Sequence, residues 1–292
     1  MAGGEKRIVV GYDASPDAEQ AVAWAVHTAR VTGQRVELVI AVSAMDPVLS
    51  DFHQVSERIA QERRAHATRS LRNAGCIDGV VTVNHGGTVP VLITASRSAD
   101  LLVVGSRGHR LAAGTFGGSI SQHVARHAAC PVVVVRERLT PSDTIVAGVD
   151  GSDESLAAVR FAIRRAAATG EQVCAIFAYP AHPLPDQDRE RHQHVASRRD
   201  RAAAHLDRWL AESQLGPPDV TVRPEVVSGP AAPALVERSA AASLVVVGSR
   251  GRDALAELLL GSTAQSVLSS AHCPVAVVRR DARGEQARAG RA

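Results

Sequence analysis

Short apolar runs alternate with longer stretches of helical spacing along this chain. In the first half the apolar runs occupy residues 7–13, 35–44, 79–86, 100–108 and 130–136. Helical patterns occupy residues 15–33, 51–74, 88–99 and 119–128. Nearly continuous Val, Ile and Leu runs joined by helices are typical of a parallel sheet that is buried on both faces. Five such runs predict an open, doubly wound α/β domain.

The second half repeats the pattern, with apolar runs at residues 144–150, 173–179, 220–229, 243–251 and 273–279. Residues 105–136 and 248–279 are identical at 16 of 32 positions. We therefore predict two tandem Rossmann-like α/β domains, at residues 1–140 and 141–280. Each is expected to hold an open five-stranded parallel sheet with helices on both faces. Residues 281–292 lack apolar periodicity and are predicted to form a disordered tail.

The composition is that of an ordinary globular protein, with 45% hydrophobic and 22% charged residues. The net charge of +3 is too small to indicate a surface for nucleic acid. No apolar run approaches the ~18–20 residues of a membrane span, and the first residues lack the apolar core of a signal peptide. We expect a cytoplasmic protein without a nucleic-acid partner.

Two residue types narrow the chemistry further. Lys6 is the only lysine, so the chain has no lysine for a Walker-type phosphate loop. The four cysteines, Cys76, Cys130, Cys174 and Cys273, form no C-x-x-C pair and no zinc spacing. They are expected to be reduced thiols.

A glycine motif follows the fourth apolar run of each half and reads G-x-x-G, nine residues, then G-S. Its residues are Gly105, Gly108, Gly118 and Ser119 in the first half and Gly248, Gly251, Gly261 and Ser262 in the second. Open α/β sheets bind ligands beyond the carboxyl ends of their strands. The motif is expected there, beside Asp13 and Asp150 at the end of the first strand of each half. One G-x-x-G alone is a weak signal, but the whole set occurs twice in the same order.

The helix openings indicate where phosphates bind. The helix after the first strand begins "SPDAE" or "SDES", and these acids complement the helix dipole and repel a phosphate. The helix after the glycine motif begins "SISQH" or "STAQS", without an acid in its first turn. Its unpaired N–H groups favour a phosphate. Asp13 and Asp150 are left to accept hydrogen bonds from a ribose or base, or to approach a metal.

With these motifs the chain resembles the universal stress protein family over residues 6–136 and 143–279. The resemblance implies an adenine nucleotide alpha hydrolase-like fold that binds ATP, often with a divalent ion, for which Mg²⁺ on the phosphates is the candidate. Carried over residue by residue, it implies nucleotide contacts at Gly11, Asp13, Val42, Gly105, Arg107, Gly108, Gly118, Ser119 and Ile120, and at Gly148, Asp150, Tyr179, Gly248, Arg250, Gly251, Gly261, Ser262 and Thr263.

The resemblance also implies association through the apolar last strand of each half, both between the domains of one chain and in a homodimer. The halves differ beside the aspartate, where Tyr12 matches Val149, and at the second strand, where Val42 matches Tyr179. The two adenine pockets are therefore expected to differ in affinity.

Three functions stay open from the residues. The first is an ATP-dependent stress or growth regulatory module that acts on an unknown protein partner. The second is a slow ATPase or phosphoryl-transfer enzyme that uses the same sites. The third is a scaffold with vestigial sites. No general base emerges, because His109 of the first half is Arg252 in the second, so no catalytic residue is assigned. The intact motifs argue against the scaffold.

Overall fold

The computed structural model describes residues 6–42, 50–107, 119–137, 141–180, 188–212, 220–252 and 260–280. The predicted tail at residues 281–292 lies outside this part of the chain, as do Gly108 and Gly118. The chain divides into two compact units, residues 1–137 and 138–292.

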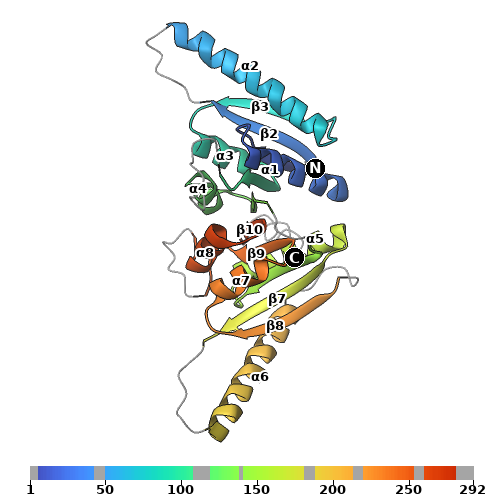
Figure 1. The fold of residues 1–292 in the computed structure, drawn as a ribbon, viewed down its shortest axis with the longest axis vertical. Coiled ribbons are helices and arrows are strands. Elements are labelled where there is room, and N and C mark those ends of the chain that lie inside the picture. Colours follow the sequence, from blue (N-terminus) through green and yellow to red (C-terminus); the bar gives the residue numbers. More distant parts are fainter. Residues whose placement is uncertain are drawn as a thin grey trace, which may run out of the picture. The chain divides into compact units, whose positions relative to one another are not determined.

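The first unit is a five-stranded parallel sheet with four helices (Figure 1). Its strands are β1 (Arg7–Gly11), β2 (Arg35–Val42), β3 (Val80–His85), β4 (Leu101–Gly105) and β5 (Val132–Val135). Its helices are α1 (Pro16–Thr32), α2 (Ser50–Asn73), α3 (Thr88–Ser96) and α4 (Ser119–His127). The strand order is β3-β2-β1-β4-β5, with all neighbouring strands parallel.

The second unit repeats this architecture. Its strands are β6 (Thr144–Val149), β7 (Gln172–Tyr179), β8 (Val222–Ser228), β9 (Leu244–Gly248) and β10 (Val275–Val278). Its helices are α5 (Asp153–Thr169), α6 (Asp188–Glu212), α7 (Ala231–Ser239) and α8 (Ser262–Ser270). The order β8-β7-β6-β9-β10 matches that of the first unit, again with parallel neighbours. The predicted fold class is confirmed.

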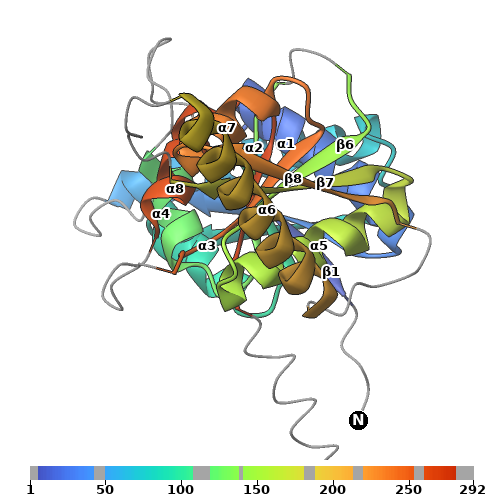
Figure 2. The same cartoon turned by 90° about the horizontal axis from the view of Figure 1, so that it is seen from below.

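Helices cover both faces of each sheet. The chain winds outward from β1 through α1 and α2, then returns to build β4 and β5 through α3 and α4. Right-handed crossovers put the first helix pair on one face and the second pair on the other. In the second unit, α6 contacts β7 and β8 and lies across them in Figure 2. The strand order reverses between β1 and β4, and between β6 and β9, where open α/β sheets bind ligands.

Local residues set both ends of α1. The Ser15 side chain accepts a hydrogen bond from the Ala18 N–H, and Pro16 follows as the first helical residue. Gly33 ends the helix in the left-handed conformation. In α5, Ser152 and Gly170 fill the matching positions. The start of the first helix is therefore fixed right after the ligand edge of the central strand.

The inner strands of the sheets are buried on both faces, as the continuous apolar runs predict, whereas β3 and β8 are partly exposed. Ile8, Val9 and Val10 of β1 are fully buried, and Val246 of β9 is as well. None of the four cysteines forms a disulfide, and all but Cys76 are buried. Within the described ranges, none of the helices has the length and apolarity that a membrane crossing needs.

Candidate functional site

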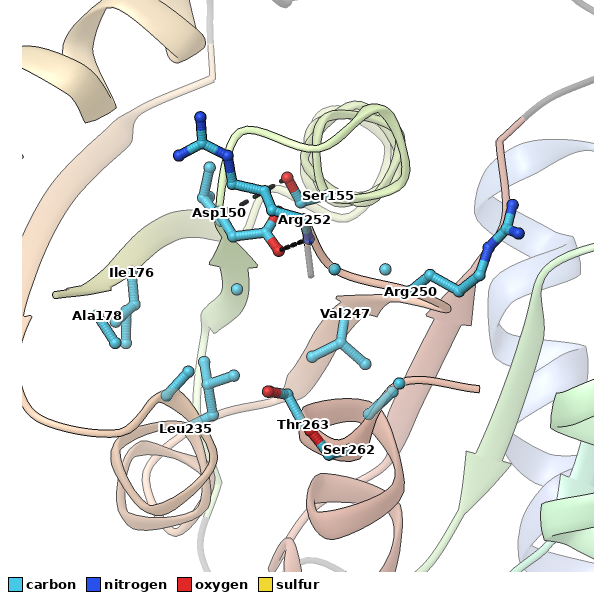
Figure 3. Close-up of a pocket in the computed structure, with 17 residues that line it drawn as sticks. Asp150, Ser155, Ile176, Ala178, Leu235, Val247, Arg250, Arg252, Ser262 and Thr263 are labelled. Carbon is cyan, nitrogen blue, oxygen red and sulfur yellow. Dashed lines mark hydrogen bonds between the residues drawn. The ribbon is translucent and has the colours of Figure 1, made fainter. Parts of the chain in front are cut away.

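A cavity of about 270 Å³ lies at the carboxyl edge of the second unit, at the switch point between β6 and β9 (Figure 3). Its walls come from the ends of β6, β7 and β9, the loop after β9 and the N-terminal halves of α5, α7 and α8. Its lining residues are Gly148, Val149, Asp150, Ser155, Ile176, Ala178, Ala231, Leu235, Val247, Gly248, Arg250, Gly251, Arg252, Gly261, Ser262, Thr263 and Ala264.

One wall of the cavity is apolar. It consists of Ile176 and Ala178 on β7, Leu235 on α7 and Val247 on β9. Successive side chains of a strand point to opposite faces, so Ile176 and Ala178 share one face of β7. Phe177 points to the other face, where it meets α6 with its ring 5.0 Å from that of Trp209. A flat apolar group such as a base has a matching surface on this wall.

Asp150 stands at the polar end of the cavity and fastens two loops. Its Oδ1 accepts hydrogen bonds from the Ser152 N–H at 2.9 Å and the Ser152 hydroxyl at 2.6 Å. Its Oδ2 accepts one from the Arg252 N–H at 3.0 Å, the contact drawn in Figure 3. A Cβ at Gly251 would stand 2.7 Å from the same Oδ2. Glycine is therefore needed at position 251 for the loop after β9 to close on the carboxylate.

The N-terminus of α8 opens on the opposite side of the cavity. Its N-cap is Gly261, which has no side chain to cap the helix, and its first turn holds no acid. Ser262 and Thr263 begin the helix and both line the cavity. A helix start that lacks a capping side chain presents unpaired N–H groups and the positive end of the dipole. In the first unit, α4 begins with Ser119 and Ile120 and also lacks an acid in its first turn.

Two glycines of the motif are explained by packing. A Cβ at Gly105 would stand 2.8 Å from the backbone of Asp17, and one at Gly248 would stand 2.9 Å from that of Glu154. The first turns of α1 and α5 therefore press on the strand ends. On the other face, a Cβ at Gly11 would stand 3.0 Å from Leu92. The packing of helices onto the strands therefore accounts for these glycines without a ligand.

The arginine between the paired glycines is held by an acid in both units. Arg250 donates to Glu154 Oε1 through Nη2 at 2.7 Å and Nε at 3.1 Å. Arg107 donates to Asp17 Oδ2 through its backbone N–H at 2.9 Å and its Nε at 3.3 Å. The acid of each first helical turn is thereby paired with a cation beside the site. In Figure 3 the Arg250 side chain points away from Thr263.

A polar cluster joins β1 to α2 in the first unit. The Tyr12 hydroxyl donates to the Glu19 carboxylate and lies 2.6 Å from His66 Nδ1. The Ser70 hydroxyl donates to the same carboxylate. Burial raises the pKa of Tyr12 well above its ordinary value, and the hydrogen bond to Glu19 adds to the shift. Tyr12 therefore stays protonated in this cluster.

The second unit makes the equivalent junction with aromatic rings. Trp209 of α6 packs edge-to-face on Phe177 at a centroid distance of 5.0 Å. The Arg252 guanidinium lies 5.2 Å from the centre of the Trp209 ring. Arg252 thus links this junction to Asp150, whose carboxylate accepts its backbone N–H.

A sequence profile described as the universal stress protein family matches residues 5–136 and again residues 141–279. The chain belongs to the universal stress protein family. Universal stress protein Rv1996 of Mycobacterium tuberculosis is 33% identical, with 93% of this chain and 94% of that protein aligned. Universal stress protein Rv2623 of the same organism is 32% identical, over 93% of this chain and 96% of its own length.

Solved universal stress proteins share the two-domain fold. The crystal structure of one from Archaeoglobus fulgidus has a TM-score of 0.68 at 19% identity, and covers 95% of this chain and 100% of its own. The structure of a putative universal stress protein from Pseudomonas aeruginosa has a TM-score of 0.62 at 18% identity, and covers 99% of both chains. The predicted family and fold are both confirmed.

The structure gathers eight of the nine site residues expected in the second domain of this universal stress protein around one cavity. In the second domain they are Gly148, Asp150, Gly248, Arg250, Gly251, Gly261, Ser262 and Thr263. The exception is Tyr179, which ends β7 and whose carbonyl accepts the Gly229 N–H at 2.9 Å. In the first domain, Val42 occupies the matching strand end, is buried, and likewise accepts from Gly86 at 2.8 Å.

Sequence reasoning missed the apolar wall and two polar residues, Ser155 and Arg252. The missed wall residues are Ile176, Ala178, Ala231, Leu235 and Val247. The alternation of side chains along β7 shows that Ile176 and Ala178 share one face of the sheet. It does not show which of the two faces lies under α7 and so lines the cavity. Arg252 was noted only as the counterpart of His109, and its backbone contact with Asp150 has no signature in the sequence.

Proposed function

We propose that this universal stress protein binds ATP at the carboxyl edge of each domain and works as a nucleotide-dependent regulatory module. The observation that supports this most is the second-domain cavity, which joins an apolar wall, one carboxylate and the start of α8. Its volume of about 270 Å³ lies near the lower end of small-molecule pockets, roughly 300–1,000 Å³.

The arrangement fits the parts of an adenine nucleotide in order. The base packs on Ile176, Ala178 and Leu235, and the ribose hydroxyls donate to Asp150. The phosphates lie at the N-terminus of α8, where the Gly261 cap leaves N–H groups for anions and Ser262 and Thr263 add hydroxyl donors. Glu154 of α5 packs against Gly248, and its carboxylate is paired with Arg250, so its charge does not oppose the phosphates at α8.

The lining favours binding over hydrolysis. Among the described lining residues the only carboxylate is Asp150, and none is a histidine or lysine. Both oxygens of Asp150 already accept hydrogen bonds from Ser152 and Arg252, and in this proposal their remaining lone pairs accept from the ribose hydroxyls and not from a water. We therefore rank the slow ATPase below the regulatory module. An unknown protein partner reads the state of occupancy in this proposal.

A divalent ion fits the site only as a companion of the phosphates. Mg²⁺ binds through oxygen ligands, usually one or two carboxylates with phosphates and waters. The described part of the chain holds no group of three or more His, Cys, Asp or Glu side chains able to hold a metal. Ser262 and Thr263 are the nearest hydroxyl donors at the phosphate end. Mg²⁺ would therefore bind together with ATP, as a complex with its phosphates, and not to the protein alone.

The substitution Gly261→Glu tests the placement of the phosphates. A Cβ at Gly261 has its nearest neighbour at 3.5 Å, an ordinary contact, so the fold tolerates a side chain there. The added carboxylate repels phosphate at the start of α8, and ATP affinity at the second site should fall by at least about a hundredfold, a change of about 2.7 kcal/mol. Isothermal titration calorimetry measures the loss.

Gly261→Ala is the matched control for that experiment. It adds the Cβ without the charge, and we expect ATP affinity within about threefold of the parent chain. Equal ATP affinity of the Glu and Ala variants would exclude α8 as the phosphate site. The number of nucleotides that copurify with the chain, and turnover of ATP by the parent protein, separate the module from the enzyme. Turnover above about one per minute would favour the ATPase.

Association through the last strands is also a proposal. In their own sheets, β5 and β10 each pair with one strand, and the residues of both are apolar. Such strands invite pairing with another edge. Sedimentation of the purified chain at several concentrations tests the homodimer.

A further inference from the structure

Two exposed histidines stand one turn apart on α4, away from the predicted phosphate contacts at its start. His123 and His127 lie four positions apart and therefore share one face of the helix. Their rings are nearly parallel, with an interplanar angle of 13° and centroids 6.3 Å apart. The described residues offer no third ligand to complete a larger cluster.

Backbone hydrogen bonds fix which nitrogen of each ring carries the proton. His123 Nδ1 lies 2.7 Å from the Ser119 carbonyl oxygen, and His127 Nδ1 lies 2.9 Å from that of His123. A carbonyl only accepts, so each Nδ1 must be the donor. In the neutral rings both Nε2 atoms then carry lone pairs. Histidines that ligate metals commonly donate their other N–H to a backbone carbonyl in this way.

We propose that His123 and His127 form a chelating site for a divalent transition metal of borderline softness, such as Zn²⁺ or Ni²⁺. Imidazole nitrogen suits these ions and not Mg²⁺ or Ca²⁺, which require oxygen ligands. The rings have to move somewhat closer to share one ion, a rotation within reach of exposed side chains. Two protein ligands leave the remaining coordination positions to water.

The second domain lacks this pair and so provides an internal comparison. The positions on α8 that match His123 and His127 are Ser266 and Ser270, which are both exposed. Neither serine lines the cavity at the start of α8. The metal site is therefore a property of the first domain alone and is independent of the proposed ATP sites.

Calorimetric titration of the full chain with ZnCl₂ tests the proposal, in a background where His192→Gln and His194→Gln remove another histidine pair. We expect one Zn²⁺ per chain at the tightest site, and no such binding of MgCl₂. Loss of an outer-shell partner alone usually weakens metal binding about 10- to 100-fold, so His123→Gln or His127→Gln should cost at least about tenfold. The control is His272→Gln, because His272 is exposed and has no histidine four positions away.

A gain-of-site variant covers the case in which the glutamine variants fail to fold. Ser266→His with Ser270→His recreates the spacing on α8, and a second Zn²⁺ of similar affinity should appear. Unchanged Zn²⁺ affinity in both glutamine variants, or no added Zn²⁺ in the serine-to-histidine variant, would overturn the proposal. Thermal unfolding gives a second readout, since Zn²⁺ should raise the melting temperature of the parent and not of His127→Gln.

Discussion

In the first domain α2 meets the end of β1 through the hydrogen-bonded cluster of Tyr12, Glu19 and His66, whereas in the second domain α6 meets the end of β6 through Trp209. The strand order and the residue types that cap α1 and α5 are the same in both. The long helix is thus packed against the end of the first strand by polar contacts in one domain and by an aromatic ring in the other. Either kind of contact serves at the carboxyl edge of the sheet, because α2 or α6 only has to hold the turn after the first strand in place.

The turn after the first strand responds most strongly to this difference. Ala14 and Gly151 occupy matching positions, and both adopt positive φ, at 65° and 81°. A Cβ at Gly151 would stand 2.3 Å from the Trp209 ring. In the first domain the alanine Cβ is accommodated, since no tryptophan stands over the turn.

The largest expected effect therefore comes from Gly151→Ala. The clash with Trp209 and the left-handed backbone should together destabilise the second domain by about 3 kcal/mol. Ala14→Gly in the first domain relieves the same backbone strain and should change stability by less than about 1 kcal/mol. Urea unfolding of each variant measures the difference. If both substitutions have equal effects, Trp209 does not enforce the glycine.

The acid in the first helical turn distinguishes the domains next. Asp17 is buried and accepts hydrogen bonds from the Ser106 hydroxyl at 2.6 Å and the Arg107 N–H at 2.9 Å. Glu154 instead holds the Arg250 side chain, whose guanidinium is partly exposed. Asp17 thus secures the backbone of the glycine loop, and Glu154 secures only a side chain.

Asp17→Asn should destabilise the first domain by about 2 kcal/mol, because a hydrogen-bonded carboxylate is lost and the amide cannot serve every donor. Glu154→Gln should cost less than about 1 kcal/mol, as expected for a partly exposed ion pair. Chemical denaturation followed by circular dichroism measures both. A larger loss in Glu154→Gln than in Asp17→Asn would contradict this division of roles.

The fold was readable from the sequence because its signals are local. Apolar runs mark the buried strands, and Ser15, Pro16 and Gly33 mark the ends of α1. The start of α8 was readable for the same reason, since the glycine–serine pair at its start and the absence of an acid lie within one turn, although Gly261 and not the serine is the N-cap. These features need no knowledge of what packs against them.

The rest of the site depends on contacts between distant segments. Ile176 and not Tyr179 faces the cavity, because the pleat of β7 is set by its register on β6. Gly248 belongs to the glycine motif expected at the ligand, yet the approach of α5 to the strand already excludes a side chain there. Such facts follow from tertiary packing, which no spacing of residues records.

The smallest expected effect concerns Tyr12, whose counterpart Val149 has no hydroxyl. Tyr12→Phe removes the donor to Glu19 and should destabilise the first domain by about 1 kcal/mol at neutral pH. The matched control is Tyr179→Phe at the end of β7 in the second domain. Thermal unfolding at neutral pH compares the two.

The pH dependence of that variant separates the hydroxyl from the ring. The pKa of Tyr12 in the folded chain is raised above its ordinary value of 10.0, so the folded state binds the phenolic proton more tightly than the unfolded state. The stability that this proton contributes is present below pH 10.0 and is lost as the pH rises beyond it. Tyr12→Phe lacks this proton and should lose less stability on going to alkaline pH than the parent chain does. Parallel unfolding curves for the two proteins across that range would show that Tyr12 packs as a ring alone, as Val149 does in the second domain.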